Sequence, residues 1–155
     1  MSFKMDRVHV WACEVNDRPG GVAAKLSQLD KADADLDSGC ARRLTDKPGH
    51  GMLFVAPLVG LEQQKAARAA GMHEVNDPIV MRVEGDNTAG LAHRLKHEWA
   101  IANINLHGAI LTVLGTKFLG YITFDSVEDA NKAARILAEI GVEKRAAAAA
   151  SAAKK

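Results

Sequence analysis

The sequence predicts an α+β protein made of two ferredoxin-like βαββαβ units in tandem, each an antiparallel sheet with two helices on one face. Two observations predict it: one series of strand, glycine turn and helix signals occurs twice in the same order, and turn signals separate strands that fit hairpins. We place the units at residues 1–76 and 77–145, followed by an Ala/Lys-rich tail at 146–155. The boundary falls at Asn76–Pro78, because a Pro after an Asx residue favours a turn.

The first half of each unit reads as a strand, a turn and a helix. Strand patterns begin at Arg7, with RVHVWACEV, and at Ile79, with IVMRVEG. In a residue-by-residue alignment of the two copies, the turn Asp17–Ala23 matches Asp86–Ala92. The helical face that follows is apolar in both copies: Val22, Leu26 and Leu29 in the first, and Leu91, Leu95 and Trp99 in the second.

The second half of each unit reads as a hairpin, a helix and a last strand. We align the starts of the second strands as Ala34–Asp37 with Ala102–Asn105. The apolar third strands are MLFVAPL from Met52 and FLGYITF from Phe118, preceded by the turn signals Asp46–Gly51 and Gly115–Thr116. Lys65–Arg68 matches Lys132–Arg135 on the second helix, and short last strands are predicted near Met72–Val75 and Gly141–Lys144.

Composition excludes several classes of protein. The 155 residues carry 20 Lys and Arg against 19 Asp and Glu, so we expect no nucleic-acid partner, which would require a basic excess. No apolar run reaches membrane-spanning length and the start lacks a signal core, which favours a cytoplasmic protein without a membrane partner. Cys13 and Cys40 form no CxxC pair, so we expect buried free thiols, no metal and no cofactor.

The strands are more apolar than a sheet with one exposed face requires. We expect Val8, Val10 and Ala12 to face the helices, which leaves Trp11 and Cys13 on the other face. The two third strands are apolar on both faces, and monomers rarely expose such patches. We therefore expect a homodimer or larger assembly, with the sheets of the two units joined edge to edge.

The first turn has the chemistry of an anion site. Gly20 and Gly21 allow backbone N–H groups to approach a ligand closely, and they stand at a helix N-terminus, which favours a carboxylate. Asp17 and Asn103 could each accept from an α-ammonium group. In the alternative interpretation nothing binds, Asp17 only caps the helix and Pro19 only starts it.

A βαββαβ unit whose first turn reads Asp-Arg-Pro-Gly-Gly-Val resembles an ACT domain, and two such units in one short chain resemble the stand-alone tandem ACT proteins. The resemblance covers residues 7 to about 144. Thr88 and Ala89 stand where the second copy would have Pro and Gly. The resemblance implies a regulatory module that binds an amino acid or a related small molecule at the interface of the two units, and that acts on a regulated enzyme.

The resemblance also implies which residues bind the ligand: those of the turn after the first strand of a unit, and those at the start of the second strand of a neighbouring unit. The turn positions are Asp17, Arg18, Pro19, Gly20, Gly21 and Val22 in the first copy, and Asp86, Asn87, Thr88, Ala89, Gly90 and Leu91 in the second. The strand positions are Asp35, Leu36, Asn103 and Ile104.

Other constellations indicate no catalysis. His93 and His97 have the i, i+4 spacing of a helical metal pair, but they lie opposite the apolar face with no third ligand nearby, so we interpret them as a solvated face. No serine stands in a nucleophile elbow. We expect a non-catalytic, allosteric amino-acid-binding protein. The alternatives are a purely structural oligomerisation module and an acylphosphatase-like hydrolase that holds phosphate with Arg18.

Overall fold

The computed structural model describes the backbone of residues 3–152 and all side chains in that range except those of 142–145 and 147–151. Residues 1–2 of the predicted first unit and 153–155 of the tail lie outside the described residues. The strands are β1 (Lys4–Arg7), β2 (Val10–Asn16), β3 (Ser38–Arg43), β4 (His50–Ala56), β5 (His73–Val75), β6 (Ile79–Asp86), β7 (Leu106–Leu114) and β8 (Lys117–Phe124). The helices are α1 (Gly21–Asp30), α2 (Gly60–Ala69), α3 (Leu91–Ile101) and α4 (Val127–Ala152).

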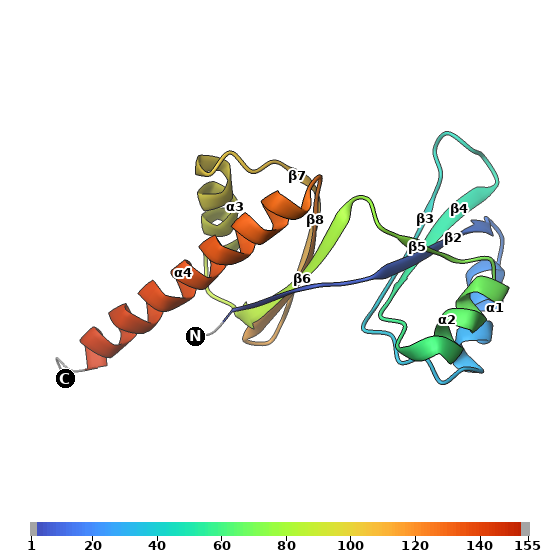
Figure 1. Cartoon of the computed structure of the whole chain (residues 1–155), viewed down its shortest axis with the longest axis horizontal. Helices are drawn as coiled ribbons and strands as arrows, with labels where there is room; N and C mark the ends of the chain where they lie inside the picture. Colours follow the sequence, from blue (N-terminus) through green and yellow to red (C-terminus); the bar gives the residue numbers. More distant parts are fainter. Residues whose placement is uncertain (1–2, 153–155) are drawn as a thin grey trace. The chain divides into compact units, whose positions relative to one another are not determined.

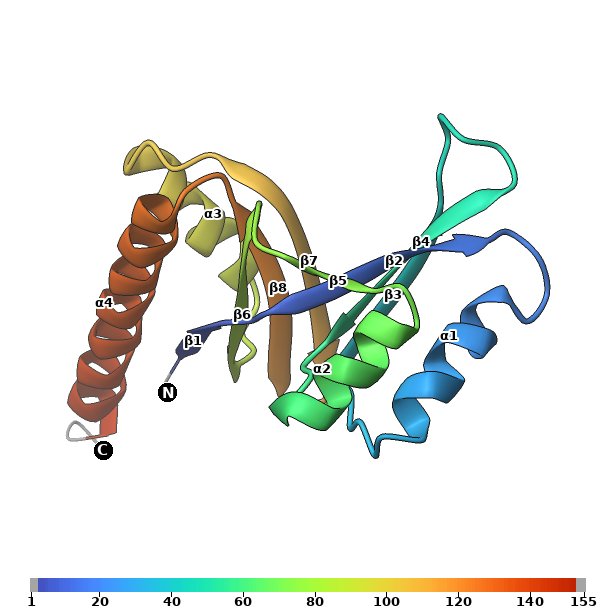
Figure 2. The same cartoon turned by 45° about the vertical axis from the view of Figure 1, so that its right-hand side comes forward.

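One compact unit, which we call the continuous unit, is Val8–Asn76. Its sheet has the order β3-β4-β2-β5 with every neighbouring pair antiparallel. Helices α1 and α2 lie on the same face of this sheet (Figure 2). The predicted ferredoxin-like βαββαβ fold is therefore confirmed for this unit.

The other unit, which we call the split unit, combines Met1–Arg7 with Asp77–Lys155 (Figure 1). Its sheet has the order β1-β6-β8-β7, again antiparallel throughout, and α3 and α4 pack on it. Strand β1 takes the place that β5 holds in the continuous unit, beside the first strand of the βαββαβ series. The fold is confirmed here too, but its fourth strand comes from the start of the chain.

This exchange corrects two predictions. The last strand predicted near Gly141–Lys144 is wrong, since α4 continues through these residues to Ala152. The first unit predicted at 1–76 differs from the structure at its N-terminal segment, because residues 4–7 pair with the other unit from Lys4↔Glu84 to Arg7↔Met81. The physical reason for the helix is the alanine-rich sequence, because alanine is the strongest helix former.

Strand β1 is anchored by side chains of its own segment. Phe3 packs against Phe118, with ring centroids 5.8 Å apart. Gly85 leaves the room for this contact, because a Cβ there would come within 3.0 Å of the Phe3 ring. Met5 also packs against the core of the split unit. The short strand therefore contributes apolar contacts as well as hydrogen bonds.

The core of the continuous unit lies between its helices and sheet, and it corrects the predicted strand phase. Trp11, Cys13 and Val15 pack in this core with residues of the helices, while Ala12 has the opposite orientation. The prediction that Trp11 and Cys13 leave the helix side is wrong. The phase of Trp11, Cys13 and Val15 is apolar throughout and is buried by the helices, whereas the phase of Ala12 also contains the exposed Glu14 and Asn16. Burial raises the pKa of the Cys13 thiol, as expected for an inert free cysteine.

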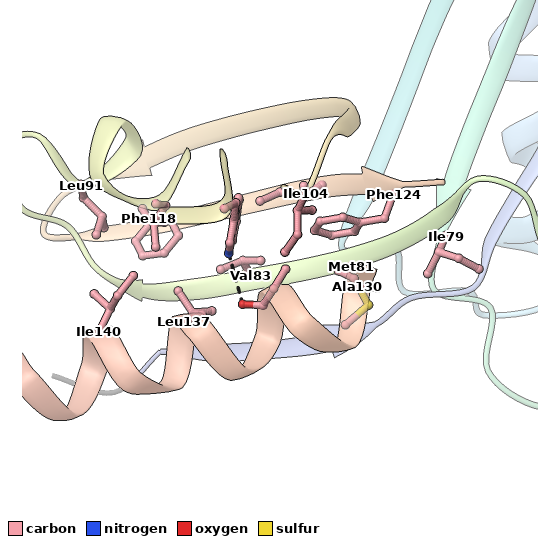
Figure 3. Packing of buried hydrophobic residues seen from close by; sticks show 14 residues of the cluster. Ile79, Met81, Val83, Leu91, Ile104, Phe118, Phe124, Ala130, Leu137 and Ile140 are labelled. Atoms are coloured by element: carbon pink, nitrogen blue, oxygen red, sulfur yellow. Dashed lines mark hydrogen bonds between the residues drawn. The ribbon is translucent and has the colours of Figure 1, made fainter. Parts of the chain in front are cut away.

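The core of the split unit is built around aromatic residues (Figure 3). Trp99 packs edge-on against Phe124, with centroids 6.1 Å apart. Its indole N–H donates to the carbonyl oxygen of Ala133 at 3.2 Å, which satisfies the one polar atom of the side chain. Leu95 and Leu137 complete the contact between α3 and α4 over the sheet.

The face of the split-unit sheet away from the helices is mixed rather than apolar. Arg82 pairs with Glu84 at 2.6 Å, and their strand neighbours on this face include Leu119 and Tyr121. The most exposed apolar strand residues are instead on the edge strand β7: Ile110, Val113 and Leu114. None of the helices within residues 3–152 combines the length and apolarity of a membrane span.

Candidate functional site

The turn between β2 and α1 is a type II β-turn over Arg18–Gly21. The Gly21 N–H donates to the Arg18 carbonyl at 3.0 Å. Pro19 holds the second position and Gly20, with φ 83° and ψ −9°, holds the third. Type II turns favour Pro and require a positive φ at these two positions. The sequence Arg-Pro-Gly-Gly therefore encodes this turn directly.

The split unit has the same turn over Thr88–Leu91. The Leu91 N–H donates to the Thr88 carbonyl at 3.1 Å, and Gly90 has φ 78° and ψ 0°. Ala89 takes the place of Pro19, which a type II turn tolerates. The departures at Thr88 and Ala89 therefore leave the backbone of the turn unchanged.

These turns correct the alignment of the two copies. The positive φ angles show that Gly20 is equivalent to Gly90, whereas the alignment of the two sequence copies matched Gly21 with Gly90. A second bond agrees: Asp17 donates its N–H to Gly49 at 3.0 Å, and Asn87 donates its N–H to Thr116 at 2.8 Å. The residue equivalent to Asp17 is thus Asn87 rather than Asp86.

Gly21 is required for a different reason from Gly20. Its φ is not positive, but a Cβ at Gly21 would lie within 3.0 Å of the carbonyl oxygen of Asn16. A Cβ at Gly20 would meet nothing within 4 Å, so only its backbone angle demands glycine there. The equivalent of Gly21 in the split unit is Leu91, whose side chain is buried in the core.

Both helices begin without a side-chain cap. The first intrahelical bonds are made by the N–H groups of Ala24, to Gly20, and of Arg94, to Gly90. The N–H groups between them precede the first helical acceptor, so the helix itself leaves them without a partner. They belong to Val22 and Ala23 in α1, and to Ala92 and His93 in α3. Each turn therefore presents open donors at the positive end of a helix dipole.

The two turns differ in charge. In the continuous unit Asp17 pairs with Arg43 of β3, with 2.8 Å between Oδ2 and Nε, and Arg18 is exposed. Asp17 makes no cap bond to α1, so the capping role that the alternative interpretation assigns to it is absent. In the split unit the neutral Asn87 stands at the position of Asp17. The first turn is therefore ionic and the second is uncharged at the same position.

Ion pairs also form at the ends of the strands that precede the two turns. Lys117 binds Asp86, and its hydrogen bond holds the pKa of that carboxyl below the usual range. Lys47 donates to both oxygens of Glu14, at 2.8 and 2.7 Å, and this hydrogen bond likewise lowers the pKa of Glu14. These lysines tie each hairpin loop to the strand before the turn.

The strand starts have an unexpected equivalence. Asp33 and Asn103 both have positive φ, 50° and 57°. Each is the left-handed residue of a Schellman motif: Ala34 donates its N–H to Leu29 and Ile104 donates its N–H to Trp99. Asn103 therefore matches Asp33, and the predicted match with Asp35 is wrong.

The predicted strand positions have separate environments. Ile104 is buried in the core of the split unit, and Leu36 packs against the core of the continuous unit. Asp35 and Asn103 are exposed. In each unit the turn precedes the N-terminal end of the first helix, and the strand start follows the C-terminal end of the same helix. The structure thus brings together Asp17–Val22 in one turn and Asp86–Leu91 in another, and it separates both from the strand starts of their own units.

Sequence reasoning missed Arg43, Lys47 and Lys117 as partners of the acidic residues around the turns. The sequence signal for these partners is their position near a hairpin turn. Antiparallel pairing brings such residues close to the end of the strand that precedes the ligand-binding turn proposed for each unit.

No known protein-family profile and no curated protein matches the sequence. The chain is similar to solved protein BT0572 from Bacteroides thetaiotaomicron, with a TM-score of 0.70 and 10% identity over 83% of this chain and 87% of that one. It is also similar to the ligand-free regulatory subunit of aspartate kinase from Thermus thermophilus, with a TM-score of 0.60 and 13% identity over 88% and 95% of the two chains. For the regulatory subunit of aspartate kinase from Thermus flavus, the TM-score is 0.57 and the identity is 16% over the same shares of the two chains. The tandem fold that the resemblance to ACT proteins predicts is therefore confirmed.

Proposed function

We propose that this chain is a non-catalytic regulatory protein that binds an amino acid at the turn before α1. The observation that carries the proposal is the uncapped start of α1 behind a type II turn, which leaves the N–H groups of Val22 and Ala23 for a ligand. The likeness to regulatory subunits of aspartate kinase supports a regulatory role.

The chemistry of the turn fits a zwitterion. Backbone N–H groups at a helix N-terminus bind a carboxylate. Asp17 would accept from the α-ammonium group, and its ion pair with Arg43 orients its carboxylate. The turn before α3 offers the same donors but has the neutral Asn87, so we propose that it binds the same ligand more weakly. The strand starts Asp35–Leu36 and Asn103–Ile104 are proposed to contact a ligand held by the turn of a neighbouring domain.

A stability screen with a matched pair of variants tests this proposal. At a hundredfold excess over its dissociation constant a ligand stabilises the folded state by about 2.7 kcal/mol, which raises the melting temperature by roughly 10 °C or more for units of this size. Ala23→Pro removes one N–H donor in the first helical turn, where Pro is best tolerated. Ala23→Gly keeps the donor.

We expect Ala23→Pro to weaken binding by roughly tenfold or more, because hydrogen bonds to charged groups contribute about 1.5–3 kcal/mol. Ala23→Gly should bind like the wild type. Circular dichroism establishes that both variants are folded. A broad amino-acid panel with no shift, or a folded Ala23→Pro variant with full affinity, would contradict the proposal.

The role of Asn103 needs a substitution that respects its backbone. Asn103→Gly keeps the positive φ and removes only the side chain, whereas Asn103→Ala would strain the Schellman motif. If the amide contacts the ligand, Asn103→Gly weakens binding in calorimetry more than Asp35→Ala does. Equal effects of the two variants would remove Asn103 from the site.

We also propose that the protein is a homodimer or larger, through β7. This edge strand has nine residues, no Pro and three exposed apolar side chains: Ile110, Val113 and Leu114. The other edges are short or charged: β1 reads KMDR, β3 ends in Arg42-Arg43 and β5 has three residues. Natural proteins protect edges by shortness and charge, and β7 alone among these four has neither.

Sedimentation of the Ile110→Lys variant tests the assembly. We expect an oligomer in the wild type at micromolar concentration, and a shift to the 16.6 kDa monomer in the variant. Val59→Lys is the matched control, because Val59 is as exposed but stands outside the strands. A wild-type monomer would contradict this part of the proposal.

The same measurements separate the alternatives. An oligomer that responds to no ligand would favour the structural module. Hydrolysis of an acyl phosphate that is lost in Arg18→Ala would favour the acylphosphatase-like enzyme.

A further inference from the structure

Helix α3 has a polar face whose centre is a pair of histidines. Leu91, Leu95 and Trp99 bury the opposite face in the core of the split unit. His93 and His97 are both exposed and stand one helical turn apart. Their rings are nearly parallel, with an angle of 19° between the planes and 5.8 Å between the centroids. The two imidazoles therefore extend side by side from one face into solvent.

These rings differ from the other paired histidines. His9 binds Glu74 at 2.5 Å, and His107 binds Asp125 at 2.9 Å. Among the described side chains, neither the imidazole of His93 nor that of His97 makes a hydrogen bond or an ion pair, and the two rings contact each other. Both ring nitrogens of each residue are therefore open to an external ligand.

We propose that His93 and His97 form a two-imidazole chelating site for a late first-row divalent cation, with Cu²⁺ preferred. Histidines at i and i+4 on one helical face can bind one metal ion together. Imidazole nitrogen suits Cu²⁺, Ni²⁺ and Zn²⁺, and Cu²⁺ has the highest affinity in this series.

The surroundings define the class of ion. Within residues 3–152 no group of three or more His, Cys, Asp or Glu side chains could hold a metal, so two imidazoles are the whole protein ligand set and water takes the other positions. A closed tetrahedral zinc site would need four protein ligands. Mg²⁺ and Ca²⁺ require oxygen ligands, and the sequence neighbours Arg94 and Lys96 are cationic. The site therefore fits an ion that accepts two nitrogens and several waters.

Binding should also clamp the helix. An ion held by both rings links the first turn of α3 to its second, and any ligand of the folded state alone raises stability by mass action. Protons compete for the same nitrogens, so the affinity falls as the pH is lowered. This proposal uses the side chains of His93 and His97, whereas the amino-acid site proposed at the turn before α3 uses backbone N–H groups, one of which belongs to His93. The stronger amino-acid site, before α1, shares no residue with it.

The test is a titration of the metal-free protein with CuSO₄ in a non-coordinating buffer, followed by calorimetry and by electron paramagnetic resonance. We expect one Cu²⁺ per chain with two nitrogen donors. His93→Gln and His97→Gln should each lower the affinity by roughly tenfold or more. His9→Gln, which removes an exposed histidine elsewhere, should leave it unchanged.

A second control keeps the number of histidines on α3. The double variant His97→Gln, Glu98→His places the rings five residues apart, where they no longer share a face, and it should lose the chelate. His93 and His97 are exposed and Glu98 is half-buried, so circular dichroism must establish that each variant is folded. Absence of Cu²⁺ binding to the wild type, or full affinity in the variant with both His93→Gln and His97→Gln, would overturn the proposal.

Discussion

The continuous unit and the split unit have the same strand order, but only the first is made from consecutive residues. In the continuous unit β5 follows α2 directly and closes the sheet beside β2. In the split unit α4 continues as a helix, and β1 closes the sheet from the other end of the chain. The comparison teaches that a sheet position is defined by its neighbours in space, and that either end of a chain can fill it.

The turns provide a second comparison. Gly20 and Gly90 have nearly the same backbone angles, and the turns share their hydrogen bonds. Their side chains differ, with Asp17 and its partner Arg43 in one turn and Asn87 in the other. The two units thus share the backbone conformation of the turn and differ in the charge of the side chains around it.

Removal of β1 should have the largest effect. We expect a chain that begins at Val8 to lose the protection of the split unit in hydrogen exchange, because β6 becomes an unpaired edge and Phe118 loses Phe3. The loss should be on the order of 5 kcal/mol, comparable to the whole stability of a small domain. The continuous unit should keep its protection.

A peptide of residues 1–9 added in trans should restore part of that protection. Removal of residues 146–155 is the control and should leave both units protected. Equal losses in the two units after removal of β1 would break the distinction between them.

Side chains placed at the two turns should separate the roles of the glycines. Gly21→Ala should lower the free energy of unfolding by about 3 kcal/mol, because the new Cβ overlaps the Asn16 carbonyl oxygen. Gly20→Ala and Gly90→Ala should each lower it by about 1 kcal/mol through their left-handed backbone alone. Denaturant unfolding measures all three, and a Gly21→Ala variant as stable as Gly20→Ala would contradict the steric argument.

Lysines that bind helix ends should have matched effects in the two units. Lys25 of α1 donates to the carbonyl of Ala70 at the end of α2, and Lys132 of α4 donates to Ala102 at the end of α3, both at 2.6 Å. Lys25→Met and Lys132→Met should each cost about 1–2 kcal/mol. Lys65→Met, which removes an exposed i, i+3 pair with Glu62, should stay within about 0.5 kcal/mol. Unequal losses of stability in Lys25→Met and Lys132→Met would show that the two units do not depend equally on these hydrogen bonds.

The smallest expected effect is on acid stability. The pKa values of Glu14 and Asp86 are lowered in the folded state by Lys47 and Lys117. Their contribution is therefore present above the unfolded pKa, about 4, and is lost as the pH falls through the lower folded value. Glu14→Gln and Asp86→Asn should each make stability slightly less dependent on pH between about 5 and 3. Melting curves across this range measure the slope, and slopes identical to the wild type would rule out these ion pairs as a source of acid sensitivity.

Local patterns predicted most of the fold. The apolar spacing of Leu91, Leu95 and Trp99 places a helix correctly, because a buried helical stripe needs only residues close in sequence. The fourth strand of the split unit could not be predicted this way. It depends on pairing between Lys4 and Glu84, which no local signal records.

The errors at the site have similar causes. Two adjacent glycines look alike in a sequence, yet Gly20 is needed for its φ and Gly21 for its lack of a Cβ. The sequence alignment therefore matched Gly90 with Gly21 instead of Gly20. The strand phase at Trp11 was predicted wrongly from Val10 and Ala12 alone, although the exposed Glu14 and Asn16 share their phase and mark it as the side away from the core.

The interrupted path of the split unit has a consequence during synthesis of the chain. Residues 4–7 leave the ribosome before their partner strand, residues 79–86, which is made some 70 residues later. At about 5–20 residues per second, β1 waits roughly 4 to 15 s. Meanwhile residues 8–76 can complete their own sheet. Strand β1, although made before the continuous unit, should thus reach its place after that unit has formed its sheet.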